Sequence, residues 1–264
     1  MLLHYIKMAV RQLLKYKFHT IVSALCMAIG LTVNGYLGTG IKLNSEQCGV
    51  IDITRSGVTP ADNNWPTGIE YKQLVEKNIE DFKKKTLPCE NITIVQGDAV
   101  NLHMLKNDEY DIVLHLGPMY HLSAESERKA AVSEALRVTK PNGIVFMAYI
   151  LNEMTVINYF FRNGHINEAE ARENIISSNW RFKENKKRHL SFYRIEDINA
   201  LMSGFDVHRL HLVGTEMISG AMRELLLSMS DEEFACYTEY IYSICERPDM
   251  IGLSGHLLDI FEKK

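Results

Sequence analysis

The spacing of apolar residues after residue 68 predicts a regular alternation of helices and strands. Apolar side chains recur three and four positions apart over residues 70–85, which predicts a helix. Nearly continuous apolar runs predict strands over 91–99, 110–116 and 143–150. Another helix is predicted over 126–140, stopped by the Pro-Asn-Gly that follows it. This alternation indicates an α/β fold with a largely parallel central sheet.

Residues 151–190 interrupt the alternation. They are polar and helical in places, and they contain the aromatic cluster Tyr159–Phe161, so we expect an insertion over the sheet. Beyond the insertion, the pattern predicts a short strand at 191–194, a helix at 195–205, a strand at 206–216, helices at 217–229 and 231–245, and a last strand at 256–264.

The run IVLHLGPMYHL, residues 112–122, begins as a buried strand and ends in polar and aromatic side chains. Gly117 and Pro118 stop the strand, and Tyr120 and His121 follow at once. In open α/β sheets, ligands bind outside the carboxyl ends of the strands. We therefore expect this turn and the Gly97-Asp98 turn to lie on one rim.

Met1–Tyr36 differs from the rest of the chain, because a basic amphipathic segment precedes the uncharged run Ile21–Leu37. The stretch resembles the start of a permease subunit of ABC transporters and has the length of a short membrane span. The positive-inside bias would then export everything after Leu37, including the whole α/β domain, which conflicts with the reducing cytoplasm that the cysteine pattern described below favours. We expect a buried part of the fold or a foreign leader. A membrane tether through residues 21–37, with membrane association, is the alternative.

Composition narrows the function classes. Hydrophobic residues make up 46% and charged residues 23% of the 264 positions, as in soluble globular proteins. A net charge of -4 gives no reason to expect a nucleic-acid partner. The cysteines are odd in number and include no C-x-x-C pair, so neither a disulfide framework nor a zinc or other metal site is expected, and a reducing cytoplasm fits best. They are Cys26, Cys48, Cys89, Cys236 and Cys245.

Four segments in order carry a resemblance to a known family. VQGDAVNL, EYDIVLHLGPMYHL, ALRVTKPNGIVFMAYI and ERPDMIGLSGHLLDIFEKK together resemble the class I S-adenosylmethionine-dependent methyltransferases, most of all small bacterial ones with a Leu-Gly-Pro-Met/Leu-Tyr-His-Leu turn. The resemblance covers about residues 70–264. It implies a Rossmann-like methyltransferase fold, with a mostly parallel sheet, helices on both faces, an antiparallel last strand and a helical insertion after the fifth strand.

The resemblance also implies S-adenosyl-L-methionine as cofactor and methyl transfer to a small-molecule substrate. The chain then divides into an atypical leader, 1–36, and a methyltransferase-like domain, 37–264, with its insertion at 151–190. A second division, in which the first quarter is unrelated to the family, starts the domain near Gly68.

Site residues follow from the same resemblance. It implies that Asp98 hydrogen-bonds the adenine amino group and that Ala99 packs nearby. The backbone of Leu116 and Gly117 would border the cofactor, and the turn that carries Tyr120 and His121 would face cofactor and substrate.

The first family motif, a strand followed by Gly-x-Gly-x-Gly, is degraded here. Gly38, Thr39 and Gly40 fit its end, but Tyr36 stands where the first glycine is expected, and a side chain there opposes close backbone approach. Gln73 matches the position of the acid that holds the ribose hydroxyls. Asp52 and Glu70 are the alternatives for that acid.

Methyl transfer from a sulfonium requires no metal and no covalent residue, because the cofactor carries the activated group. His121 is the candidate general base, and the alternative is that it only hydrogen-bonds. Tyr120 is expected to pack against the cofactor more than to react. His115, inside the strand, is expected to be a satisfied core histidine. A degenerate, non-catalytic protein of the same fold is the alternative function.

Overall fold

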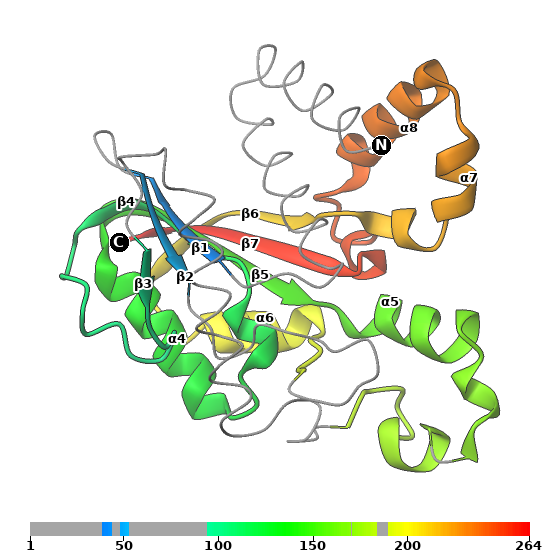
Figure 1. Ribbon diagram of the computed structural model, residues 1–264, viewed down its shortest axis with the longest axis horizontal. Coiled ribbons are helices and arrows are strands. Elements are labelled where there is room, and N and C mark those ends of the chain that lie inside the picture. Colours follow the sequence, from blue (N-terminus) through cyan, green and yellow to red (C-terminus); the bar gives the residue numbers. More distant parts are fainter. Residues whose placement is uncertain (1–38, 44–47, 53–93, 170, 184–189) are drawn as a thin grey trace.

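The computed structural model describes residues 39–43, 48–52, 94–169, 171–183 and 190–264. The described part forms a seven-stranded sheet in the order β3-β2-β1-β4-β5-β7-β6 (Figure 1). The strands are β1 Thr39–Leu43, β2 Cys48–Asp52, β3 Ile94–Gln96, β4 Tyr110–His115, β5 Thr139–Ile150, β6 Val207–Gly214 and β7 His256–Lys263.

Helices follow the predicted order along the described chain. The α-helices are α4 Glu125–Val138, α5 Asn152–Val156, α6 Ile195–Met202, α7 Arg223–Ser228 and α8 Asp231–Ile244. The short helical turns are η1 Pro118–His121, η2 Ile157–Arg162, η3 His165–Asn167, η4 Ala171–Ile175, η5 Met217–Gly220 and η6 Ile251–Leu253. The predicted insertion after the fifth strand is therefore helical, as expected. The predicted helix over 70–85 and the apolar run 21–37 lie outside the described residues.

Strand directions confirm the predicted fold class and add one reversal. β2 pairs with β3, and β4 with β5, in parallel, while β7 runs antiparallel to both β5 and β6 as predicted. β1 runs antiparallel to both of its neighbours, β2 and β4. The strands β2 to β6 therefore share one direction, and β1 opposes them together with β7. The fold is a Rossmann-like methyltransferase fold with a reversed β1.

The fifth strand begins earlier than the sequence predicts. β5 starts at Thr139, directly after α4, and not at Gly143. The pairing shifts between Tyr110 and Ile112 of β4, so the Pro-Asn-Gly stretch forms a bulge inside the strand. Asn142 there has a φ of 61°, and a Cβ at Gly143 would lie 3.0 Å from the carbonyl oxygen of Asp111. The Pro-Asn-Gly sequence, which usually marks a turn, therefore lies inside a strand here.

The core has two layers, one on each face of the sheet. Side chains of β5 point alternately into the two layers. Val145, Met147 and Tyr149 pack against α4 and α6, and Phe146 and Ala148 pack on the other face. Cys245, the C-cap residue of α8, contacts this second cluster. Figure 1 shows α4 and α6 below the sheet and α7 and α8 above it. Burial on both faces explains why the second part of β5, residues 144–150, is apolar throughout.

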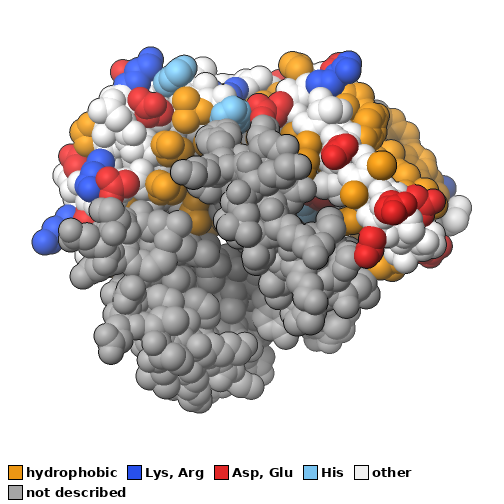
Figure 2. All heavy atoms as spheres, turned by 90° about the horizontal axis from the view of Figure 1, so that it is seen from above, with side chains coloured by type: hydrophobic (Ala, Val, Ile, Leu, Met, Phe, Trp, Pro, Cys, Tyr) orange, Lys and Arg blue, Asp and Glu red, His pale blue; other side chains and the backbone are white. Residues whose placement is uncertain are grey.

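Different types of side chain are mixed on the described surface that Figure 2 shows. Figure 2 shows acidic and basic side chains interspersed with hydrophobic ones on the described part of one face. Among the described residues, no helix has both the length and the hydropathy needed to span a bilayer.

One ion pair lies partly inside the first layer. Asp259 of β7 is 0% exposed, and both of its carboxylate oxygens accept hydrogen bonds from Arg209 of β6, at 2.8 and 2.7 Å. Arg209 also donates to Asn199 Oδ1 of α6 at 2.6 Å. Burial raises the pKa of Asp259, and the guanidinium opposes that rise. The pair therefore holds a carboxylate where an unpaired charge would be costly.

Replacing Arg209 with Met should lower the free energy of unfolding by about 3 kcal/mol, because Asp259 would lose its buried partner. The double variant that also carries Asp259→Leu should recover most of this loss. Urea unfolding of the two single variants and the double variant measures the coupling. Strictly additive losses would show that the pair is not coupled.

Candidate functional site

Three strands bring their ends to one edge of the sheet. Thr39, the first described residue of β1, pairs with Asp52, the last residue of β2. Asp52 in turn pairs with Gln96, the last residue of β3. Because β1 is reversed, its amino end lies beside the carboxyl ends of β2 and β3. The two residues after β3, Gly97 and Asp98, continue from this edge.

The same edge continues across β4. Lys42 pairs with Val113 in the antiparallel β1–β4 ladder, so the register brings Thr39 level with Leu116, just past the end of β4. Gly117 follows and is buried. The edge therefore joins residues that the sequence resemblance assigns to the cofactor: Thr39, Gly40, Asp98, Leu116 and Gly117. Gly38 and Gln73 lie outside the described residues.

The glycine-rich segment has a different local structure from the one expected. The family pattern predicts that it follows a strand, but Thr39 and Gly40 are the first two residues of β1. The prediction of a loop after a strand is therefore wrong for these two residues. The reversal of β1 still gives them the same edge, because an antiparallel strand begins where its neighbours end.

Asp98 forms a turn after β3. Its Oδ1 accepts a hydrogen bond from the backbone N–H of Val100 at 3.2 Å, and its carbonyl accepts one from Asn101 at 2.9 Å. Ala99 is buried in the core layer with α4. The turn-forming role of Asp98 is thus present, and its role toward a cofactor stays a prediction.

The turn after β4 is held by a distant segment. Pro118 opens η1, and the fully buried Met119 follows it. Tyr193 Oη donates a hydrogen bond to the carbonyl of Met119 at 2.6 Å. The N–H of Ser191 donates one to the carbonyl of Tyr120 at 2.7 Å. The short helix therefore has its backbone carbonyls fixed from outside.

Arg128 of α4 secures the end of the same turn. Its Nε donates to the carbonyl of Leu122 at 2.9 Å, and its Nη2 donates to that of Ser123 at 2.8 Å. The guanidinium lies 5.4 Å from the centre of the Tyr193 ring. No sequence signal identifies Ser191 and Tyr193, because they lie far from the turn in sequence. Arg128 is only five and six residues from its partners, but these partners are backbone carbonyls, which leave no sequence signal.

Tyr120 and His121 lie together on the turn. Tyr120 Oη donates a hydrogen bond to the carbonyl of Leu116 at 3.2 Å, and burial raises its pKa to about 12. Tyr120 therefore keeps its proton at neutral pH and cannot act as a base there. The half-buried His121 contacts the Tyr120 ring, with ring centres 4.7 Å apart. The catalytic role of His121 stays a prediction.

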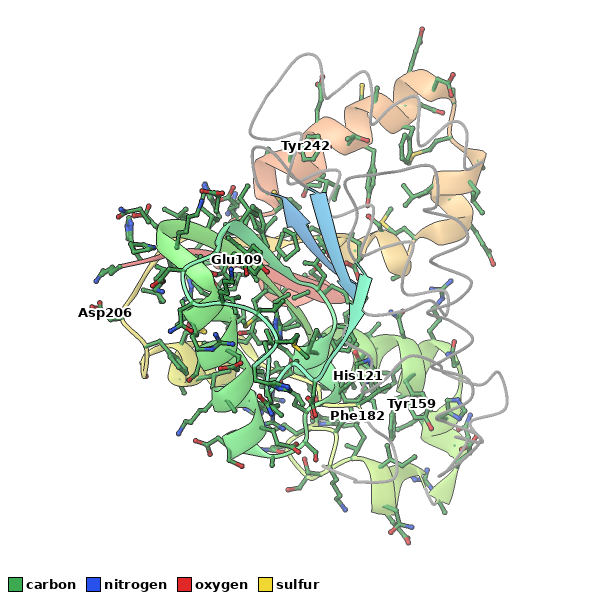
Figure 3. The ribbon with its side chains drawn as sticks, turned by 60° about the vertical axis from the view of Figure 1, so that its left-hand side comes forward. Glu109, His121, Tyr159, Phe182, Asp206 and Tyr242 are labelled. Carbon is green, nitrogen blue, oxygen red and sulfur yellow. The ribbon has the colours of Figure 1, made fainter. Side chains whose placement is uncertain are left out.

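Aromatic residues of the insertion pack beside this turn segment. The rings of Phe182 and Phe192 lie 4.5 Å apart, and Phe192 is next to Ser191, which is bonded to the turn. Figure 3 shows His121, Phe182 and Tyr159 in the same part of the molecule. Phe160 is fully buried, whereas Phe161 and Trp180 pair at the surface, 53% and 47% exposed. The predicted aromatic cluster is thus partly core and partly surface.

His115 corrects one expectation. It is buried as predicted, with 3% exposure, but its Nε2 has no hydrogen-bond partner. Burial lowers its pKa to about 4, so the imidazole is neutral at pH 7. We expected a core histidine with its hydrogen bonds satisfied. The structure instead shows a buried Nε2 without a partner, on the residue that precedes Leu116. Within the described part of the chain, no three metal-ligating side chains gather.

His115 should make the protein acid-sensitive. The unfolded chain binds a proton at pH 6.5 and the folded one only near pH 4, so stability falls as the pH drops through this window. Between pH 7 and 5 the loss should be about 2 kcal/mol. Urea unfolding of His115→Leu should show a shallower dependence over this range. An unchanged slope would mean that His115 does not titrate as described.

Comparisons with known proteins match part of the chain to a family. Residues 67–147 match the protein family described as "Methyltransferase domain", a span that includes β3, β4 and the turn. Among solved structures, similarity extends to the N-methyltransferase NodS from Bradyrhizobium japonicum WM9, at 9% identity over 94% of this chain and 98% of that one, with a TM-score of 0.43. A comparison with curated proteins finds no match.

Two further structures are similar at low identity. A possible histamine N-methyltransferase from Thermotoga maritima is 14% identical, with a TM-score of 0.39 over 72% of this chain and 70% of that one. The cyclase SpnF is 14% identical, with a TM-score of 0.41 over 72% of this chain, which spans only 64% of the cyclase. At these TM-scores the likenesses carry no inference about function. The match over residues 67–147 identifies this part of the chain as similar to a methyltransferase domain.

Proposed function

We propose that the protein transfers a methyl group from S-adenosyl-L-methionine to a small-molecule acceptor. The observation that carries the proposal is the single sheet edge shared by Thr39, Asp52, Asp98 and Leu116. It lies at the carboxyl ends of β2, β3 and β4, where ligands of open α/β sheets bind. The methyltransferase-domain match over residues 67–147, which include β3 and β4, supports it.

The residues present at the edge fit an adenosine group. Asp98 presents a carboxylate just beyond β3, which suits the hydrogen-bond donors of an adenine amino group. Asp52 ends β2, so it is the preferred replacement for the ribose acid missing at Gln73. The backbone after Leu116 would border the group. Gly40, the second residue of β1, lies at the same edge and has no side chain to prevent close approach.

When bound, the cofactor supplies a methyl group already activated on a sulfonium. The protein must then exclude water and align the acceptor. The rigid turn around Tyr120 and His121 suits alignment, because Tyr193 and Arg128 fix its backbone. For His121, general base and hydrogen-bond donor are both open roles.

We also propose a cytoplasmic location, since the cysteine pattern favours a reducing compartment. A membrane tether through residues 21–37 is the competing proposal.

Isothermal titration with S-adenosylhomocysteine tests cofactor binding. Asp52→Asn and Asp98→Asn should each weaken binding roughly 10- to 100-fold, as expected when a charged hydrogen-bond acceptor is lost. Asp111→Asn is the matched control, because this carboxylate lies at the amino end of β4, paired with Lys140 at 2.8 Å. It should leave affinity unchanged.

Two results would contradict the proposal. Absence of binding by the folded, unmodified chain would favour a non-catalytic protein of the same fold. Equal losses from Asp98→Asn and Asp111→Asn would show that the affected carboxylates act through stability and not through contact with the ligand.

A further inference from the structure

A carboxylate–histidine pair lies where β6 ends and β7 begins. Glu216 follows β6, and His256 is the first residue of β7. His256 Nδ1 is 2.7 Å from Glu216 Oε1. The two side chains are 9% and 30% exposed, so the pair is largely shielded from water.

The backbone around the pair is built to bring the two groups together. Thr215 Oγ1 donates a hydrogen bond to the second carboxylate oxygen of Glu216. The N–H of Thr215 donates to the carbonyl of His256 at 3.1 Å. A Cβ at Gly255 would collide with Glu216 Oε1, so only glycine leaves room for this carboxylate. The carboxylate is therefore positioned from two sides.

The pair lies at the same edge of the sheet as the candidate cofactor residues. His256 pairs with Ile150, the last residue of β5. In the parallel β4–β5 ladder His115 pairs with Met147, so Ile150 is level with Pro118 of the turn. One strand, β5, lies between β4 and β7 in the sheet. The backbone of His256 thus lies roughly 10 Å, two strand spacings, from the line of β4 at this level.

One ring nitrogen of His256 remains available. Glu216 engages Nδ1, and none of the residues that the structure describes forms a hydrogen bond with Nε2. A carboxylate that accepts a hydrogen bond from Nδ1–H leaves a lone pair on Nε2 and stabilises the imidazolium that forms when Nε2 takes a proton.

Other carboxylates nearby are engaged elsewhere. Glu153 of α5 pairs with Arg194 at 2.6 Å, and Glu246, just beyond α8, pairs with His211 at 2.8 Å. Among the described residues, Glu216 is therefore the carboxylate that acts on His256.

We propose that His256, held by Glu216, is the proton acceptor for the methyl acceptor, which carries an ammonium or a phenolic hydroxyl group. The N–H or O–H bond of the acceptor breaks, its proton moves to His256 Nε2, and the electron pair stays on the nitrogen or oxygen as the nucleophile. The imidazolium later returns the proton to solvent. This inference rests on the proposed methyl transfer and assigns its base to β7 in place of His121.

Tyramine, which carries both a primary ammonium and a phenol, is a probe that needs no turnover. In NMR spectra of the full chain, the Hε1 resonance of His256 should shift saturably with tyramine and stay unmoved by 4-ethylanisole, which has neither proton. His211 is the internal control, because it has the same contact with a glutamate but lies within β6. No shift of His256, or equal shifts of both histidines, would overturn the proposal.

Kinetics separate proton transfer from structure. With labelled S-adenosylmethionine and a panel of primary amines and phenols, His256→Gln should lower kcat/KM by roughly 100-fold or more, and His211→Gln should leave it within about twofold. Glu216→Gln should lower kcat and leave KM nearly unchanged, because the amide oxygen still accepts a hydrogen bond from Nδ1 but carries no charge to stabilise the imidazolium. A purely structural pair would instead raise KM and lower S-adenosylhomocysteine affinity together with kcat, which would overturn the proposal.

S-adenosylhomocysteine affinity distinguishes a failure of the proposed base from a failure of the proposed methyl transfer. It should be the same in His256→Gln and the unmodified chain. If the unmodified chain binds this ligand but methylates no amine or phenol, the inferred acceptor class is wrong. If it does not bind, the proposed function fails, while the tyramine titration still decides whether His256 meets such groups.

Discussion

The burial of β5 on both faces is the constraint on which the rest of the structure depends. Its side chains alternate between the two core layers, and its edges pair with β4 and β7. Such a strand cannot slip in register without moving apolar side chains into the wrong layer. Its last residue, Ile150, therefore has a fixed position at the sheet edge. The register of the two ladders then places Pro118 and His256 beside it.

The chain beyond β5 uses that fixed point to bring distant segments together. The N–H of Tyr193 donates to the carbonyl of Ile150 at 2.8 Å, and its hydroxyl reaches the carbonyl of Met119. The end of β5 thus anchors the turn after β4 through a residue more than forty positions away in sequence. On its other side, the N–H of Leu151 donates to the carbonyl of Gly255, next to the Glu216–His256 pair. Both halves of the proposed site rest on one strand end.

Local patterns were sufficient to predict much of the fold. The extents of β4, α4, α6, β6 and β7 follow from apolar periodicity, because each buries one or both faces in the core. The early start of β5 was not predictable, since a Pro-Asn-Gly stretch normally ends an element and here forms a bulge. The reversal of β1 was also missed, because strand direction depends on pairing with distant segments.

The candidate site divides in the same way. Asp98 and the turn through His121 carry local signals, namely a Gly-Asp turn and a strand end in Gly-Pro. Tyr193 and the Glu216–His256 pair carry none, because their partners lie far away in sequence. Arg128 carries none, because its partners are the backbone carbonyls of Leu122 and Ser123. Asp52 is one of two alternatives for the ribose acid. The register of β2 places it at the carboxyl end of that strand, and Glu70 lies outside the described residues. Antiparallel pairing lets a reversed β1 supply the same edge, so the site depends on register more than on strand direction.

The central claim is that one sheet edge, assembled from β1 to β4, receives the cofactor. Backbone amide chemical shifts of the full chain, recorded with and without S-adenosylhomocysteine, test it most directly. The largest changes should fall at residues 39–40, 52, 97–99 and 116–117, with little change at the opposite edge, at Asp108, Asn142 and Lys263. Changes centred on that opposite edge, or binding that leaves these four segments unperturbed, would contradict the account.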